Sequence, residues 1–183
     1  MKKVFILLFL VIVAFASPKM AFAQTQETAS KSAIINYDLA YPGILPDNPF
    51  YKLKVLRDKI SERLITNPAK KAEFYLLQAD KGILAAAILV DKKEIKLAQE
   101  TALKAENNMT LLTYELKKFT KKPDDSLFKK LKEASLKHQE VLSSLITRLP
   151  QSEQSTFITV LNFSKTNLQT IEKVEKRKFY ILR

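Results

Sequence analysis

The 183-residue sequence contains no cysteine, no tryptophan, only two glycines and a single histidine. Without cysteine there are no disulfides, thiolate nucleophiles or iron–sulfur ligands. One histidine cannot supply the two or three imidazoles of common catalytic zinc sites. Gly43 and Gly82 are too few for the glycine-rich loops that hold nucleotide phosphates. Composition alone does not exclude a metal site made of carboxylates, but the residue spacing of a calcium-binding loop is absent. We therefore predict no cofactor and no metal site.

His138 is the one side chain suited to general-base work near neutral pH without a large pKa shift. It lies on the apolar seam of a predicted helix, seven residues after Leu131 and four before Leu142. A histidine in this position more commonly hydrogen-bonds to a neighbouring helix than catalyses a reaction. The nearby Ser135 lies on the same regular helix, which offers no strained turn or oxyanion donors. The sequence therefore predicts a non-enzymatic protein without catalytic residues.

The first residues have the pattern of an export signal. Two lysines precede an unbroken apolar run at residues 4–16, which is shorter than the roughly 20 residues of a membrane-spanning helix. Ala21 and Ala23 then provide the small side chains that signal peptidase reads before Gln24. We predict that residues 1–23 are a cleaved signal peptide, with an uncleaved anchor as the alternative. The expected location is the bacterial periplasm, cell surface or extracellular space, since export without cysteine fits an envelope protein.

The remaining chain divides into a short leading part and a long helical part. Residues 24–45 begin with a polar tail and contain the turn signal Pro42-Gly43, so we expect a flexible or extended segment. From residue 46 to 183, apolar residues recur every three or four positions, and no strand alternation is present. The predicted fold is an all-α, antiparallel bundle of about five helices with short loops. The expected helix boundaries are Asn48-Pro49, Asn67-Pro68, Pro123-Asp124-Asp125, Pro150 and a capping Ser152.

Two of these helical patterns raise specific questions. The first predicted helix, at residues 49–65, carries an apolar face, and its members are Phe50, Leu53, Leu56, Ile60 and Leu64. Residues 91–94 interrupt the apolar helical pattern that follows. They form either a tight hairpin between two helices or a solvated part of one helix of about 50 residues. We favour the hairpin, because an unsupported helix of that length is rare in a compact domain. The apolar seam that follows could pack internally or pair with a second chain, so the oligomeric state stays open.

The sequence GILPDNPFYKLK at residues 43–54 resembles the opening signature of a bacterial domain of unknown function. The resemblance continues at residues 67–73, 138–142 and 149–153, and covers residue 42 to about residue 173. It implies a fold and a location, because members occur in exported or membrane-tethered envelope proteins, and it implies no catalytic residues. The sequence lacks the glycine often present at the 91–94 hairpin. It also lacks the membrane-anchored regulatory portion of some relatives, so no role in sigma-factor control is implied.

Lysines crowd the predicted turn between the third and fourth helices. Such a group can bind polyanions by charge neutralisation, although it can also be an ordinary solvated surface. Nucleic acid is not expected as a partner of an exported protein, and arginine, which reads phosphate better, is scarce here. Anionic lipid or wall polymer fits better. The candidate contacts are Lys117, Lys118, Lys121, Lys122, Lys129 and Lys130.

Two functional hypotheses follow. The first is an exported, non-enzymatic protein-interaction module of the bacterial cell envelope, because helical seams and export are combined with an absence of catalytic parts. The alternative is a basic polyanion or membrane-surface binder that uses the lysine cluster. The apolar residues within 178–183 offer either a final packed turn, a membrane-surface contact or a docking tip.

Overall fold

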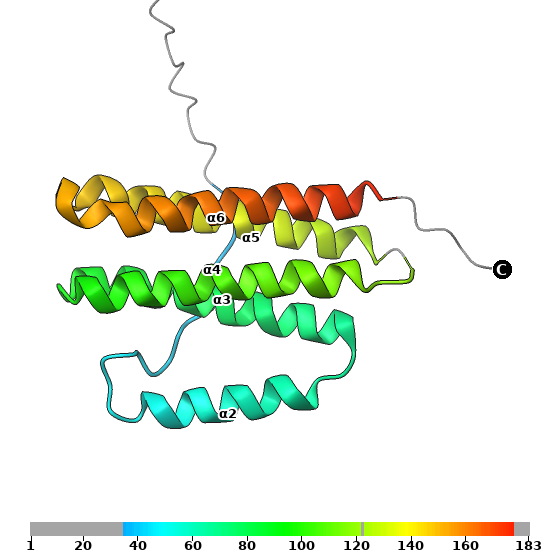
Figure 1. Ribbon diagram of the computed structural model, residues 1–183, viewed down its shortest axis with the longest axis horizontal. Helices are drawn as coiled ribbons and strands as arrows, with labels where there is room; N and C mark the ends of the chain where they lie inside the picture. Colours follow the sequence, from blue (N-terminus) through cyan, green and yellow to red (C-terminus); the bar gives the residue numbers. More distant parts are fainter. Residues whose placement is uncertain (1–34, 122, 178–183) are drawn as a thin grey trace, which may run out of the picture. The chain divides into compact units, whose positions relative to one another are not determined.

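The computed structural model describes residues 35–121 and 123–177, and this part of the chain is all-α (Figure 1). The expected antiparallel fold with about five helices is confirmed, since successive helices run in opposite directions and no strand occurs in the described part. Residues 1–34, which include the predicted signal peptide, lie outside it, as do Lys122 and residues 178–183. The helices are α2 (Tyr51–Leu64), α3 (Pro68–Asp91), α4 (Ile95–Lys117), α5 (Asp125–Arg148) and α6 (Gln151–Glu175).

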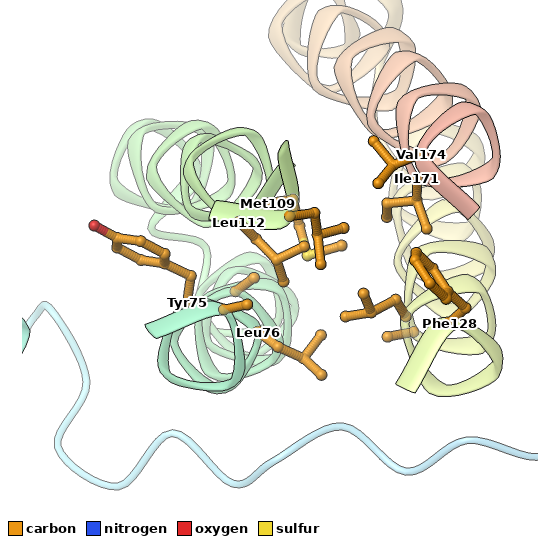
Figure 2. Packing of buried hydrophobic residues seen from close by; sticks show 12 residues of the cluster. Tyr75, Leu76, Met109, Leu112, Phe128, Ile171 and Val174 are labelled. Atoms are coloured by element: carbon orange, nitrogen blue, oxygen red, sulfur yellow. The ribbon is translucent and has the colours of Figure 1, made fainter. Parts of the chain in front are cut away.

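Helices α3 to α6 form two hairpins, α3–α4 and α5–α6, which pack against each other. Contacts between the hairpins run from α4 to α6 and from α3 to α5. Each helix contributes the apolar seam that its three- and four-residue spacing predicts. Figure 2 shows one of the two hydrophobic clusters, in which side chains of all four helices meet. Its labelled members are Tyr75, Leu76, Met109, Leu112, Phe128, Ile171 and Val174.

The helix boundaries confirm two predicted caps. The Asn67 side chain accepts hydrogen bonds from the backbone N–H groups of Ala69 (2.9 Å) and Lys70 (3.1 Å), and Pro68 occupies the first helical position. Asp124 caps α5 by accepting from the N–H of Ser126 at 3.4 Å. These side chains satisfy N–H groups that have no partner within the helix.

Two other boundary predictions are wrong. The first helix begins at Tyr51 and not at residue 49, because the Asn48 side chain accepts from the Phe50 N–H at 2.9 Å and forms a turn before the helix. Ser152 does not cap α6. That helix begins at Gln151, directly after the extended Pro150, so Ser152 already lies inside the first turn.

The turn at residues 91–94 separates α3 from α4, as favoured from the sequence. The N–H of Glu94 donates to the carbonyl of Leu89 (2.9 Å), and the N–H of Lys93 donates to that of Val90 (3.0 Å). These two bonds make a Schellman motif, which requires a left-handed residue. Lys93 occupies that position with φ = 67°. The chain therefore places a lysine where glycine is the least strained residue.

Replacing Lys93 with glycine should stabilise the protein. A residue with a Cβ atom in the left-handed region costs about 1 kcal/mol relative to glycine, and the Lys93 side chain is exposed and has no hydrogen-bond or ion-pair partner in the described part. We expect Lys93→Gly to raise the free energy of unfolding by about 0.5–1 kcal/mol in urea denaturation. Lys96→Gly, within the regular α4 helix, should lower it by a similar amount. Destabilisation by both variants would contradict the assignment of the turn.

The α3–α4 hairpin is closely packed because small residues face each other. Gly82 of α3 lies against Ala105 of α4, and a Cβ atom on Gly82 would come within 2.6 Å of the Ala105 Cβ. Alanines Ala79, Ala86 and Ala102 are also fully buried. These small side chains allow the backbones of the two helices to pack at a short distance from each other.

A polar layer divides the core at the middle of the bundle. One hydrophobic cluster contains Leu76 and Met109, and the other contains Ile83 and Phe157. Between them, each of the four helices contributes buried polar side chains at the corresponding height. These side chains are Asp80 of α3, Glu106 of α4, Ser135 and His138 of α5, and Ser164 and Asn167 of α6.

Candidate functional site

The centre of the polar layer is a charged group of three side chains. His138 is completely buried, and its two ring nitrogens lie 2.9 Å from Glu106 Oε1 and 2.9 Å from Asp80 Oδ1. Ionised carboxylates only accept hydrogen bonds, so both nitrogens must carry a proton. Burial alone lowers the pKa of His138, but hydrogen bonds and charge from Asp80 and Glu106 outweigh it and raise the pKa to about 9. The group is therefore an imidazolium between two carboxylates.

The remaining carboxylate oxygens also have partners. The Tyr37 hydroxyl donates to Asp80 Oδ2 at 2.7 Å, and Asn167 Nδ2 donates to Glu106 Oε2 at 3.0 Å. Burial and the neighbouring Asp80 raise the pKa of Tyr37, which keeps its hydroxyl protonated. The network therefore links the segment before α2 with α3, α4, α5 and α6. We call these five residues the buried charge network.

The side chains of this network bond to one another and leave no free lone pair on His138. A doubly protonated imidazole has no lone pair with which to accept a proton or bind a metal. Within residues 35–121 and 123–177, no group of three or more acidic, histidine or cysteine side chains is arranged to hold a metal ion. Because all four carboxylate oxygens accept hydrogen bonds, the network fixes how the four helices align. The predicted contact of His138 with a neighbouring helix is confirmed, and two helices take part.

Of the five members of the network, only His138 was identified from the sequence. Asp80 and Glu106 lie 58 and 32 residues from His138 along the chain. Each does follow a buried seam residue by four positions, since Asp80 comes after Leu76 and Glu106 comes after Ala102. One signal could have found them: each of the two helices has an acidic residue at a position where the apolar seam would otherwise continue.

The predicted lysine cluster lies at the α4–α5 turn. Lys117 and Lys118 are at or just beyond the end of α4, Lys121 is in the turn, and Lys129 and Lys130 are in α5, all exposed. Lys118 pairs with Glu115 at 2.8 Å, and Lys129 with Glu133 at 3.9 Å. The Lys117 ammonium lies 5.0 Å from the centre of the Tyr114 ring. Only Lys121 and Lys130 of the five described lysines have no such partner.

Several large apolar side chains of the described residues are exposed together on α2. This helix buries no side chain. Its predicted apolar face exists, but it points to solvent, with exposed fractions from 52% for Ile60 to 76% for Leu64. We name this surface the α2 stripe; its members are Leu53, Leu56, Ile60 and Leu64, and Phe50 extends it before the helix.

The opposite side of α2, which faces α3, carries the two carboxylates of the helix as well as Tyr51 and Val55. Glu62 Oε1 accepts from the Tyr75 hydroxyl at 2.6 Å. Burial, and after it this hydrogen bond, raises the pKa of Tyr75. Asp58 is likewise partly buried and pairs with Arg57 at 2.7 Å. A surface helix usually turns its apolar face inward, whereas the four-residue apolar face of α2 points outward.

A hollow of about 430 Å³ lies where the loop before α2 meets the start of the helix. Its apolar lining comes from Tyr41, Ile44 and Leu53, and its charged lining comes from Lys54, Arg57 and Lys81. Burial, together with the cations Lys81 and Arg57, lowers the pKa of Lys54, while Asp58 acts in the opposite direction. The hollow is thus lined by cations and by no carboxylate. None of the helices in the described ranges is long and apolar enough to cross a membrane.

Comparison with known families gives one match. Residues 43–152 match a family described as "Domain of unknown function (DUF5667)". The match includes α2, most of the lining of the hollow and three members of the buried charge network, whereas Tyr37, Tyr41 and Asn167 lie outside it. No curated protein and no solved structure shows significant similarity to the chain.

Proposed function

The chain belongs to the DUF5667 family, and from this premise we propose that it is an exported, non-enzymatic interaction module of the bacterial cell envelope. Its docking surface is the α2 stripe. The apolar run and the small residues before Gln24 support export. The envelope location follows from the resemblance of residues 43–54 to domains of exported or membrane-tethered proteins.

The exposure of the α2 stripe carries this proposal. Soluble proteins rarely leave several large apolar side chains of one helix face in water, and such patches mark interaction sites. Helices α3 to α6 bury their apolar seams against one another, and α2 contributes no buried side chain to this core. The exposure of the stripe is therefore not needed for the bundle to fold. Burying two of these side chains against a partner supplies about 3–6 kcal/mol before the costs of association. That contribution is large enough to dominate a docking interface.

The non-enzymatic part of the proposal is supported by the buried charge network. His138 uses both nitrogens inside the core, and Asp80 and Glu106 use all their carboxylate oxygens. A general acid or base needs a free proton or lone pair in contact with substrate. These three groups are instead occupied and enclosed.

A partner in the envelope can be a protein or an anionic surface. A protein partner is the first hypothesis from the sequence alone. The alternative is an anionic surface bound by the lysine cluster at the α4–α5 turn, where Lys121 and Lys130 are exposed and unpaired. Pairing of Lys118 and Lys129 with glutamates reduces the net charge of that cluster. We therefore place the docking surface on α2.

Co-sedimentation with isolated cell envelopes tests the choice of surface. We expect L53S/I60S in residues 24–183 to weaken binding by roughly tenfold to a hundredfold, because two exposed apolar side chains are lost. The matched control is L136S/I158S, which removes one leucine and one isoleucine, exposed by 41% and 43%, from α5 and α6. It should bind like the natural sequence. K121E/K130E should also retain binding.

Two results would reject α2 as the docking surface. One is unchanged binding of L53S/I60S. The other is a loss in K121E/K130E that exceeds the loss in L53S/I60S, which would transfer the function to the lysine cluster. Circular dichroism of each variant, which should match the natural sequence, confirms that the bundle is folded.

A further inference from the structure

The charges around the α2 stripe identify the partner more closely. The exposed charged side chains of α2 are all cations, namely Lys52, Arg57, Lys59 and Arg63. The two carboxylates of the helix, Asp58 and Glu62, are partly buried on the side toward α3. A partner that covers the stripe therefore meets positive charge on both flanks and needs negative charge in return.

This charge distribution disfavours a second copy of the chain. Two α2 stripes packed against each other would bring the arginines and lysines of one helix near those of the other. Like charges across an interface are destabilising, and no exposed carboxylate of α2 is present to compensate. The stripe is therefore suited to an anionic partner of a different kind.

The hollow beside the stripe adds a second requirement. Lys54, Arg57 and Lys81 converge on it, and the Lys54 ammonium also lies 5.2 Å from the centre of the Tyr51 ring. Arginine and lysine are the usual phosphate-binding side chains. Arg57 also pairs with Asp58 at 2.7 Å, and Asp58 does not line the hollow. The apolar Leu53 belongs both to the hollow and to the stripe. One ligand must therefore present an anion directly next to apolar chains.

A phospholipid has this chemistry, because its phosphate is adjacent to its acyl chains. The α2 stripe is also a convex ridge, about 21 Å long for the 14 residues of the helix. A bilayer surface accepts such a ridge without a preformed groove, and basic amphipathic helices insert there to a depth of about 5–10 Å. A protein partner would need a complementary groove.

We propose that α2 and the loop at residues 41–44 dock on a membrane surface rich in anionic phospholipid. The α2 stripe inserts at the boundary between headgroups and acyl chains, and Lys54, Arg57 and Lys81 bind a headgroup phosphate. This inference rests on the proposed function and names the partner of the same surface. It concerns a different surface from the lysine cluster of the α4–α5 turn.

Vesicle binding by residues 24–183 tests the inference. We expect sedimentation with phosphatidylglycerol-containing vesicles at about 0.1 M salt, and none with pure phosphatidylcholine. The variant R57Q/K81Q should bind the anionic vesicles roughly tenfold more weakly, since each cation near an anionic membrane contributes a severalfold gain. The charge-matched control is K96Q/K165Q, which removes two exposed lysines of α4 and α6. It should change binding by less than about twofold.

Three results would overturn the lipid assignment. Equal losses in R57Q/K81Q and K96Q/K165Q would mean attraction by net charge alone. Equal binding to neutral and anionic vesicles would remove the role of the cations. Binding to isolated envelopes without binding to either vesicle would assign the partner to a protein or wall polymer, and the proposed function would stand. Failure to bind envelopes as well would reject both.

Discussion

Replacing His138 with leucine is expected to lower the free energy of unfolding by about 3–5 kcal/mol. The change removes the imidazolium that lies between Asp80 and Glu106 and leaves two carboxylates enclosed in the core without an opposite charge. Breaking a buried ion pair by removing one partner has a cost of about this size. Urea denaturation at pH 7, followed by circular dichroism, measures it.

The control for this prediction replaces the whole charged group. In D80L/E106L/H138L no buried charge is left without a partner, so much of the loss should be recovered. The comparison separates electrostatics from packing, because both variants carry the same leucine at position 138. A His138→Leu variant as stable as the natural sequence would contradict the ion-pair geometry. So would a triple variant less stable than His138→Leu.

Stability should also fall by about 3 kcal/mol as the pH rises from 6.5 to above 9. Asp80 and Glu106 raise the pKa of His138 to about 9, from 6.5 in the unfolded chain. A raised pKa means that the folded state holds the proton more tightly than the unfolded state. The stabilisation is therefore complete below pH 6.5 and is lost as the pH passes through 9. At about 1.4 kcal/mol for each pH unit between 6.5 and 9, the loss of stability amounts to about 3 kcal/mol.

Few side chains other than His138 change their charge in this pH range. His138 is the one histidine and cysteine is absent, so few other groups titrate between pH 6.5 and 9. Thermal unfolding across the window measures the effect, and D80L/E106L/H138L should show a nearly flat profile there. A stability that rises with pH in the natural sequence would indicate a neutral histidine in the folded state.

The sequence predicts much of the bundle because its signals are local. Asn67 and Asp124 cap helices with their own side chains, and seam residues such as Leu112 and Leu145 recur with helical spacing. The turn at residues 91–94 is marked by a break in the apolar pattern. Each of these features is decided within a few neighbouring residues.

Of the buried charge network, only His138 could be identified from the sequence. His138 could be placed on a seam, but its partners come from two other helices, and periodicity does not say which residues lie at the same height in a bundle. A search for apolar residues at helical spacing also does not select Asp80 and Glu106, because both are acidic. Tyr37 reaches the network from a segment without regular structure. Tertiary contacts determine all three.

The α2 stripe shows a different limit of sequence reasoning. Spacing correctly groups Leu53, Leu56 and Ile60 on one face, but it does not determine toward what that face points. The orientation depends on contacts with α3, where Glu62 bonds to Tyr75. A helical pattern alone therefore cannot distinguish a core seam from a docking surface.

A fluorescent probe on α2 gives the most direct test of docking through this helix. Since the chain has no cysteine, Leu56→Cys creates a single labelling site in the stripe, and Ile158→Cys creates a control site on α6. With an environment-sensitive dye and isolated envelopes, we predict a blue shift and protection from a soluble quencher at position 56, with no change at position 158. A position 56 that stays fully quenched while the protein sediments with the envelopes would contradict docking through α2.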